Sequence, residues 1–202
     1  IGRFVGRIHA VGARSTFRHR QTLDPQTFGH ANRDWLLASD LIPPDALPEW
    51  RDVTARALEA VDAAFAGGTS RTLRLHGDCH LGNILWSADG PHFVDLDAAV
   101  TGPAVQDLWM LLSGSRPEKQ RQLGAILDGY EQFMDFDRRE LVLIEALRTL
   151  RMLHHSAWIA RRWKDPAFPI AFPWFESPAY WAEQTTRLRE QLEAMAEPAL
   201  IA

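Results

Sequence analysis

Residues 76–86, His76-Gly77-Asp78-Cys79-His80-Leu81-Gly82-Asn83-Ile84-Leu85-Trp86, decide the fold because they interrupt a helical pattern with strand and loop signals. The runs at residues 72–76 and 84–86 have the composition of short β-strands. A third run, residues 92–94, follows across Ser87-Ala88-Asp89-Gly90, which is typical of a hairpin turn. Loops held by strands often carry catalytic side chains. We therefore expect a small β element with a polar loop in the middle of the chain.

Apolar residues at helical spacing precede this β element. They predict one helix over residues 4–11 and another over residues 50–65 that ends at Gly67-Gly68. The stretch between them, to about Pro48, is polar and rich in turn residues.

The helical pattern returns beyond Gly102-Pro103 and predicts helices over residues 105–112 and 123–133. Asp137, with Glu140 three residues later, has the pattern of a capping box that opens a long helix through Trp158. Ser177-Pro178 is expected to begin the last helix.

These patterns predict a mainly α fold with a small β element, of the α+β class, in a single domain over residues 1–202. The domain is expected to be helical over residues 1–70, polar and β-containing over residues 72–107, and helical over residues 103–202. With 202 residues, 46% of them hydrophobic, the chain is long enough to bury a core.

Composition also restricts the partners. The net charge of −4 gives no overall positive field for nucleic acid, and no apolar run is long enough for a membrane span. Cys79 is the only cysteine, so no intramolecular disulfide can form, and we expect a soluble, cytoplasmic protein. The first 20 residues contain five arginines and no acid. This charge indicates either a solvated helix face or a surface for an acidic partner or a phosphate-bearing ligand.

The polar loop has the spacing of a site for phosphoryl transfer. Asp78 and Asn83 are five residues apart, and Asp95 follows twelve residues after Asn83, at the end of a predicted strand. Transfer from a nucleotide needs a carboxylate that accepts the proton of the acceptor hydroxyl, and oxygen ligands for a Mg²⁺ ion that bridges the phosphates. An Asp, an Asn and a second Asp provide those groups.

An H-x-D-x-x-x-x-N segment followed by a strand-ending Asp is the catalytic-loop pattern of protein kinases, here with Gly77 in place of the usual Arg. Together with Val94-Asp95-Leu96-Asp97 and the run from Thr101 to Leu112, it resembles the aminoglycoside phosphotransferase and choline kinase branch of the kinase-like superfamily. Within that branch it is similar to the bacterial stress-response serine/threonine protein kinases. The resemblance extends along essentially the whole chain.

The resemblance implies an ATP- and Mg²⁺-dependent kinase that acts on serine or threonine hydroxyls of proteins. It implies that Asp78 is the catalytic base and that Asn83 and Asp95 bind Mg²⁺ with ATP, Asp95 thereby also being catalytic. Three supporting residues follow: Asp107 is expected to hold the loop through its backbone N–H groups, His76 to pack beneath the loop, and His80 to contact the γ-phosphate or the acceptor.

One departure from the kinase pattern concerns the nucleotide. The sequence contains no G-x-G-x-x-G motif, and its two lysines, Lys119 and Lys164, both follow the loop. We therefore expect the C-terminal lobe of a protein-kinase-like fold whose N-terminal lobe is absent, with little or no phosphoryl transfer by this chain alone.

The same residues also fit other functions. The same residues would serve a kinase for a small hydroxylated molecule, such as choline, homoserine or an aminoglycoside, or a non-catalytic lobe used as a binding scaffold. A zinc site from His76, Cys79, His80 and His92 lacks the usual ligand spacing. The aromatic residues between Trp158 and Trp181 are expected to pack in the core, unless some line an acceptor groove.

Overall fold

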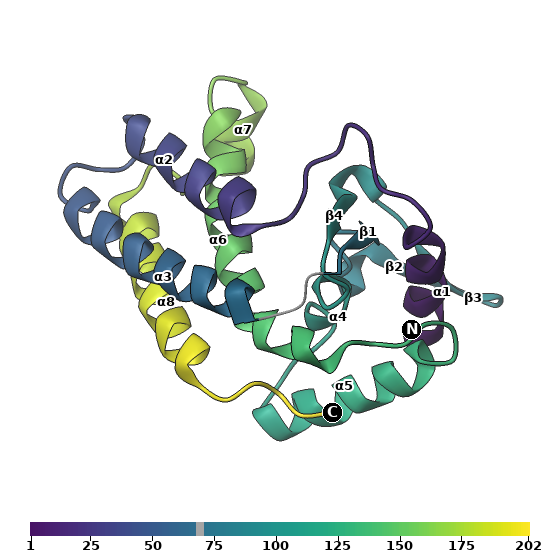
Figure 1. Cartoon of the computed structure of the whole chain (residues 1–202). Helices are drawn as coiled ribbons and strands as arrows, with labels where there is room; N and C mark the ends of the chain where they lie inside the picture. The colour runs from purple at the N-terminus through teal and green to yellow at the C-terminus, as the bar shows by residue number, and fades with distance from the viewer. Residues whose placement is uncertain (68–70) are drawn as a thin grey trace. The chain divides into compact units, whose positions relative to one another are not determined.

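The computed structural model describes residues 1–67 and 71–202 (Figure 1). The chain forms two compact units, each assembled from segments that are distant in the sequence. Unit 1 contains residues Ile1–Leu23, Gly68–Ile144 and Ala199–Ala202, and unit 2 contains Asp24–Gly67 and Glu145–Pro198. The single domain over residues 1–202 stays a prediction.

The described part of unit 1 holds the β element and three α-helices. Its strands are β1 (Leu73–Leu75), β2 (Ile84–Ser87), β3 (Gly90–Phe93) and β4 (Val100–Gly102). Its α-helices are α1 (Gly2–Gly12), α4 (Gln106–Trp109) and α5 (Arg116–Tyr130), and its short 3-10 helices are η2 (Leu81–Asn83), η3 (Leu96–Ala98) and η4 (Arg138–Leu143).

The strands form two antiparallel pairs. β2 and β3 make the predicted hairpin, in which Ile84 lies opposite Phe93 and Ser87 opposite Gly90. β1 pairs with β4. The sequence did not predict β4, because its three residues are too few to show an alternating pattern. Leu75 lies opposite Val100, so the two ends of the segment 76–99 lie side by side. This segment contains the whole polar loop.

Glycines on α1 allow this helix to approach α5 closely. A Cβ atom at Gly6 would lie 2.6 Å from the carbonyl oxygen of Tyr130, and one at Gly2 would collide with the carbonyl oxygen of Ile126. Without these methyl groups the two backbones come into direct contact. The contact brings His9, less than one turn beyond Gly6, to the end of α5.

Unit 2 is helical, with α2 (Ala31–Ala38), α3 (Leu47–Gly67), α6 (Ile144–Arg161), α7 (Ala167–Ala171), α8 (Pro178–Ala196) and a π-helix, η1 (Pro25–His30). The helix predicted over residues 50–65 is confirmed as α3; Gly68, placed at its end, lies outside the described residues. η1 and α2 occupy the polar, turn-rich stretch before Pro48, which lies within the residues 1–70 that we expected to be helical. The Asp24 carboxylate accepts a hydrogen bond from Thr27 N–H and starts η1 there.

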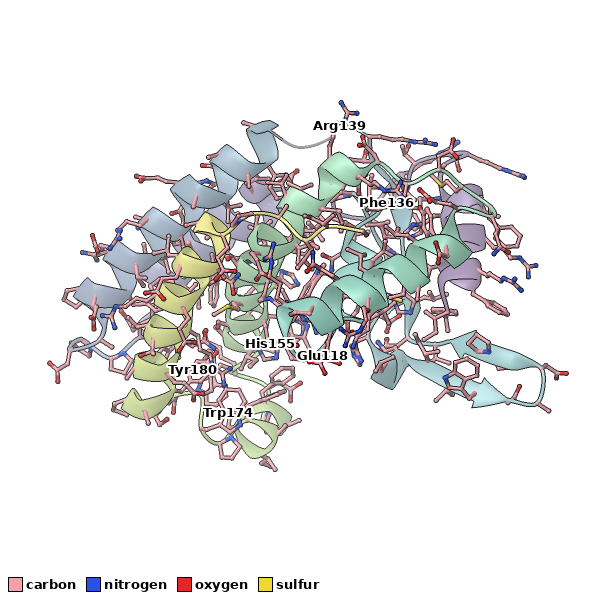
Figure 2. All side chains as sticks on the ribbon, turned by 90° about the horizontal axis from the view of Figure 1, so that it is seen from below. Glu118, Phe136, Arg139, His155, Trp174 and Tyr180 are labelled. Atoms are coloured by element: carbon pink, nitrogen blue, oxygen red, sulfur yellow. The ribbon has the colours of Figure 1, made fainter. Side chains whose placement is uncertain are left out.

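The core of unit 2 is largely aromatic. Trp50 of α3 and Trp181 of α8 are fully buried, with ring centroids 5.9 Å apart. Phe175 and Tyr180 are also buried, which confirms core packing for this part of the aromatic segment. Trp174 is partly exposed and lies against Tyr180, with ring centroids 4.8 Å apart (Figure 2).

Asp137 and Glu140 do not open a long α-helix as predicted. The Asp137 carboxylate accepts a hydrogen bond from Arg139 N–H and starts the 3-10 helix η4, and α6 begins only at Ile144. The Glu140 carboxylate is buried and accepts a hydrogen bond from Val105 N–H, 2.8 Å away. It therefore binds the residue just before α4 and does not cap its own helix. A capping box occurs instead at the start of α5, between Ser115 and Glu118.

The structure is therefore mostly helical with small antiparallel sheets, which confirms the predicted α+β class. No helix within the described residues combines the length and apolar character that crossing a bilayer requires.

The burial of Glu140 makes stability depend on pH. Burial, followed by the nearby carboxylate of Asp137, raises the pKa of Glu140 from 4.5 to about 7. Because folding raises this pKa, the folded state binds more protons between pH 4.5 and 7, and the contribution of Glu140 to stability is lost as the pH rises through this window. We expect the free energy of unfolding of the wild type, relative to Glu140→Gln, to fall by roughly 1 kcal/mol per pH unit there. Urea unfolding at several pH values measures this difference, and parallel pH profiles would contradict it.

Candidate active site

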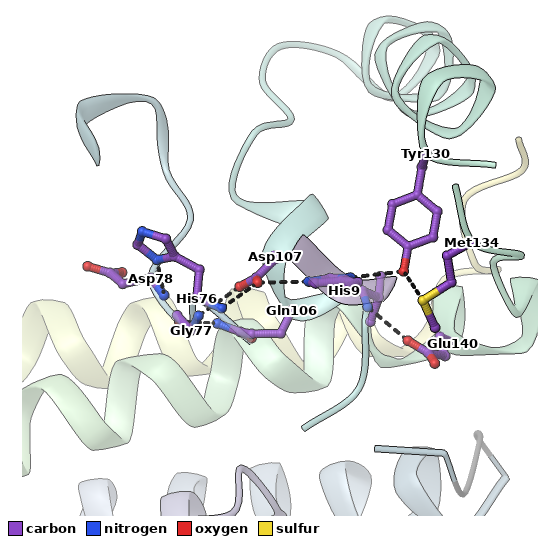
Figure 3. A network of polar contacts seen from close by, with 10 residues as sticks. His9, His76, Gly77, Asp78, Gln106, Asp107, Tyr130, Met134 and Glu140 are labelled. Carbon is purple, nitrogen blue, oxygen red and sulfur yellow. Dashed lines mark hydrogen bonds and ion pairs between the residues drawn. The ribbon is translucent and has the colours of Figure 1, made fainter. Parts of the chain in front are cut away.

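The polar loop is held at its start by Asp107, which lies on α4 (Figure 3). The Asp107 Oδ2 atom accepts a hydrogen bond from His76 N–H at 2.7 Å, and Oδ1 accepts one from Gly77 N–H at 2.8 Å. The side chain is almost fully buried, and a buried carboxylate requires such donors. This is the arrangement that the resemblance implies for Asp107.

Two residues that the sequence analysis missed hold Asp107 in turn. His9 Nε2 lies 2.9 Å from Asp107 Oδ2, and His9 Nδ1 lies 2.9 Å from the Tyr130 hydroxyl (Figure 3). Burial, together with the carboxylates of Glu140 and Asp107, raises the pKa of Tyr130, so the phenol keeps its proton. The carboxylate can only accept, so Nε2 donates to it, and the phenol can donate to Nδ1. A histidine on the apolar face of a predicted helix was the only signal for this pair.

Gly77 is suited to its place by conformation and by space. Its φ angle is +86°, and a Cβ atom there would collide with the carbonyl oxygen of Ala98. The Gln106 side chain donates a hydrogen bond to the Gly77 carbonyl oxygen at 2.9 Å. These contacts explain why glycine stands where the kinase pattern has arginine, since a side chain would displace the loop from η3.

His76 lies beneath the loop and joins it to the segment before Asp95. Its Nε2 atom donates to the carbonyl oxygen of Val94 at 2.8 Å, and its Nδ1 atom lies 3.4 Å from Asp78 N–H. The ring is buried. His76 thus fixes the backbone of Asp78 relative to the end of β3.

The hairpin brings Asn83 and Asp95 to neighbouring backbone positions. Val94 N–H donates to the Asn83 carbonyl oxygen at 3.0 Å, and Asp95 is the next residue. The Asn83 Nδ2 atom donates to the Asp78 carbonyl oxygen at 3.0 Å, which leaves Oδ1 as the atom of this amide that can bind a metal. Asp95 is exposed and has φ +62°, the only positive φ of a non-glycine residue among those described. Such strain is often found at functional sites.

His80 and Cys79 flank Asp78. The His80 Nδ1 atom accepts a hydrogen bond from Gly82 N–H at 3.0 Å, so Nε2 carries a proton, and it lies 3.5 Å from Asp78 Oδ2. His80 therefore lies against the predicted base. Burial, followed by the Asp107 and Asp78 carboxylates, raises the pKa of Cys79, so its sulfur stays a protonated thiol and a poor nucleophile.

Asn83 and Asp95 are the residues expected from the sequence to bind a metal. Within residues 1–67 and 71–202, no group of three or more His, Cys, Asp or Glu side chains could hold a metal ion. In the alternative zinc set, His76 Nε2 donates to Val94, and His92 Nε2 lies 2.7 Å from the Ser87 hydroxyl. Two protein oxygens suit Mg²⁺, which keeps several waters and takes its other ligands from phosphates.

Comparison with known proteins shows the family of the chain. Residues 1–144, more than half of the chain, match the model of the phosphotransferase enzyme family (APH). Stress response kinase A of Escherichia coli K12 is 45% identical over 200 residues, and serine/threonine protein kinase RdoA of Salmonella typhimurium LT2 is 44% identical over 200 residues. Each alignment covers 99% of this chain and 60% of the relative, so the chain spans only part of the length of these proteins. The resemblance stated from the sequence is confirmed.

A solved structure shows the same fold. The amicoumacin kinase hAmiN, in complex with AMP-PNP, Ca²⁺ and Ami, has a TM-score of 0.63 at 15% identity. The match covers 96% of this chain and 57% of that kinase.

The support of the loop by His9 can be tested by hydrogen exchange. We expect His9→Leu to speed the exchange of the His76 and Gly77 amide protons about tenfold or more, because Asp107 loses a charge-assisted hydrogen bond. His9→Gln, which keeps a donor near the Nε2 position, should retain most of the protection, and the amides of the β2–β3 hairpin should be unaffected in both variants. Equal exchange at His76 and Gly77 in the wild type and His9→Leu would contradict this support.

Proposed function

We propose that this chain, which belongs to the phosphotransferase enzyme family, carries the catalytic loop and metal ligands of a cytoplasmic serine/threonine protein kinase of the stress-response type. The observation that carries the proposal is the way the backbone joins Asp78, Asn83 and Asp95. Asn83 bonds the Asp78 carbonyl oxygen through its side chain and Val94 through its own carbonyl oxygen, directly before Asp95. The three side chains therefore project from one connected piece of backbone.

Asp78 acts in this proposal as the catalytic base. Its carboxylate is partly exposed, so an acceptor hydroxyl can reach it, whereas its backbone is fixed by His76 and Asn83. A fixed carboxylate that orients the hydroxyl and accepts its proton is the part that a kinase catalytic loop supplies. His80, beside Asp78, would contact the γ-phosphate or the acceptor.

Asn83 and Asp95 would hold the Mg²⁺ ion that accompanies ATP. When bound, that ion neutralises charge on the phosphates during transfer. Asp95 has a left-handed backbone, and its exposed carboxylate makes no capping hydrogen bond to η3, so it is available to a metal in this proposal. Asp107, His9 and Tyr130 act only by keeping the loop in place.

In this proposal, another part of the whole protein covers the phosphates of the nucleotide. The sequence has no glycine-rich G-x-G-x-x-G loop, and both of its lysines follow the catalytic loop. We therefore propose that these residues form the C-terminal lobe of a kinase-like fold, that an N-terminal lobe completes the ATP site, and that residues 1–202 alone transfer phosphate little or not at all.

A second candidate is a kinase for a small hydroxylated molecule. The observation in its favour is the structural similarity to a protein named amicoumacin kinase, although at 15% identity it supports the fold alone. Catalytic residues do not distinguish the two acceptors, since both reactions need the same base and metal. The higher identity to kinases named for stress response and for serine/threonine favours a protein acceptor. Intact Asp78, Asn83 and Asp95 argue against a scaffold without activity.

Substitution of Asp78 tests the catalytic role. In the full protein that contains this chain, we expect Asp78→Asn to lower kcat by about 10²- to 10⁴-fold with little change in the KM for ATP, because the base is lost while the nucleotide site remains. Asp95→Asn should instead raise the Mg²⁺ concentration that is needed for half-maximal activity. Asp89→Asn, the same charge change in the exposed hairpin turn, is the matched control. Wild-type turnover by Asp78→Asn would remove Asp78 as the base.

A further inference from the structure

The segment Arg14–Arg20, called here the arginine segment, carries a concentrated positive charge. It contains Arg14, Arg18 and Arg20, together with His19, and no acid occurs in the first 20 residues. The rest of the chain, residues 21–202, carries a net charge of −9. The positive charge is thus confined to a short part of an otherwise acidic protein.

The three arginines of this segment are exposed, and no described residue neutralises their charge. Among the residues that the structure describes, none of them forms an ion pair. Arg14 and Arg18 also make no side-chain hydrogen bond to any described residue. Arginine side chains in water are able to pair with an incoming carboxylate at little cost in desolvation.

Contacts with Arg74 of β1 hold the chain on both sides of Arg14. Arg74, in the middle of β1, donates hydrogen bonds to the carbonyl oxygens of Val11 at 3.3 Å and Gly12 at 3.4 Å, at the end of α1. Its guanidinium also lies 5.6 Å from the ring centroid of Phe17, which is partly buried. The segment is therefore held on the surface of unit 1 and does not need to be ordered when a partner binds.

Contacts at the other end place the arginine segment beside the candidate metal-binding residues. The Arg20 guanidinium donates a hydrogen bond to the carbonyl oxygen of Asp97, two residues after Asp95. Gln21 and Leu23 then bond to Thr101 of β4, at 3.1 and 2.7 Å. The path of the chain is thus fixed from the charged residues to the strand that follows Asp95.

We infer that the arginine segment docks an acidic stretch of the polypeptide acceptor next to the site of phosphoryl transfer. This inference rests on the proposed function, because it assumes a protein acceptor. Oppositely charged surfaces raise the rate of encounter and select partners. An acidic stretch held here would bring the neighbouring serine or threonine of the same acceptor toward Asp78 and Asp95.

The distribution of charge favours a polypeptide over the nucleotide. Arg14 and Arg18 are exposed and four residues apart in a segment without helix or strand, and an extended acidic peptide also carries its charges at several separate residues. Arg20, the arginine nearest to Asp95, already bonds a backbone carbonyl. A triphosphate with its Mg²⁺ is compact and would take its charge partners from the metal and the loop.

The double variant Arg14→Gln/Arg18→Gln tests this inference in the full protein. Neither side chain makes a hydrogen bond, ion pair or ring contact with a described residue, so the fold should be retained, with an unchanged Tm as the check. The probes are a fluorescent peptide with one serine flanked by glutamates and a matched peptide with glutamines in place of the glutamates. Fluorescence anisotropy measures binding of each peptide. Arg56→Gln/Arg121→Gln, which removes two exposed arginines elsewhere, is the control.

We expect the double variant to bind the glutamate peptide about 5-fold more weakly at low salt, with a smaller difference at high salt, and the glutamine peptide equally. The control variant should bind both as the wild type does. Equal binding of the glutamate peptide by the wild type and the double variant would overturn the inference. A raised KM for ATP with unchanged peptide binding would overturn it too, because the segment would then serve the nucleotide.

Phosphorylation of the same peptides separates this inference from the proposed function. Weaker binding by the double variant together with phosphorylation of the bound peptide by the wild type supports both. Weaker binding without phosphorylation of either peptide, or of any protein, supports the docking surface as a binding site and contradicts the proposed kinase activity.

Discussion

A buried carboxylate that must be surrounded by donors is the constraint on which this structure depends. Asp107 is almost fully removed from water, and an ionised carboxylate in that environment is costly unless hydrogen bonds replace its hydration. Two of its donors are the backbone amides of His76 and Gly77, and the third is the ring of His9. Since the amides belong to the candidate catalytic loop, satisfying the carboxylate also sets the path of that loop.

Several elements of unit 1 contribute to the hydrogen bonds around Asp107. Close contact between α1 and α5, possible because Gly6 has no side chain, brings His9 to Tyr130. The β1–β4 ladder returns the chain to its starting point after the loop and the hairpin, so that α4 can present Asp107 to the residues just beyond β1. Segments that are distant in the sequence therefore meet at the base of the loop. Of the side chains proposed for chemistry, Asn83 is buried, Asp78 is partly exposed and Asp95 is exposed.

The loop and the hairpin could be predicted from the sequence because both are local. A turn of four residues and the spacing of Asp78, Asn83 and Asp95 are properties of one short stretch of chain. The support of Asp107 by His9 and Tyr130 could not be predicted in this way, because His9 is 98 residues from Asp107 and 121 from Tyr130. Glu140 shows the opposite error: its position three residues after Asp137 suggested a local cap, but tertiary burial directs its carboxylate to Val105. Local sequence patterns do not predict the partner of a buried polar side chain when that partner is distant in the sequence.

The central claim is that Asn83 and Asp95 form the metal-binding side of a phosphoryl-transfer site and that Asp78 faces the acceptor. A crystal structure of the full protein with Mg²⁺ and a non-hydrolysable ATP analogue tests it most directly. The account predicts oxygen atoms of Asn83 and Asp95 at about 2.0–2.1 Å from the metal, with the γ-phosphate on the same side of the loop as the Asp78 carboxylate. Phosphates bound away from residues 76–95, or a metal held by other side chains, would contradict it.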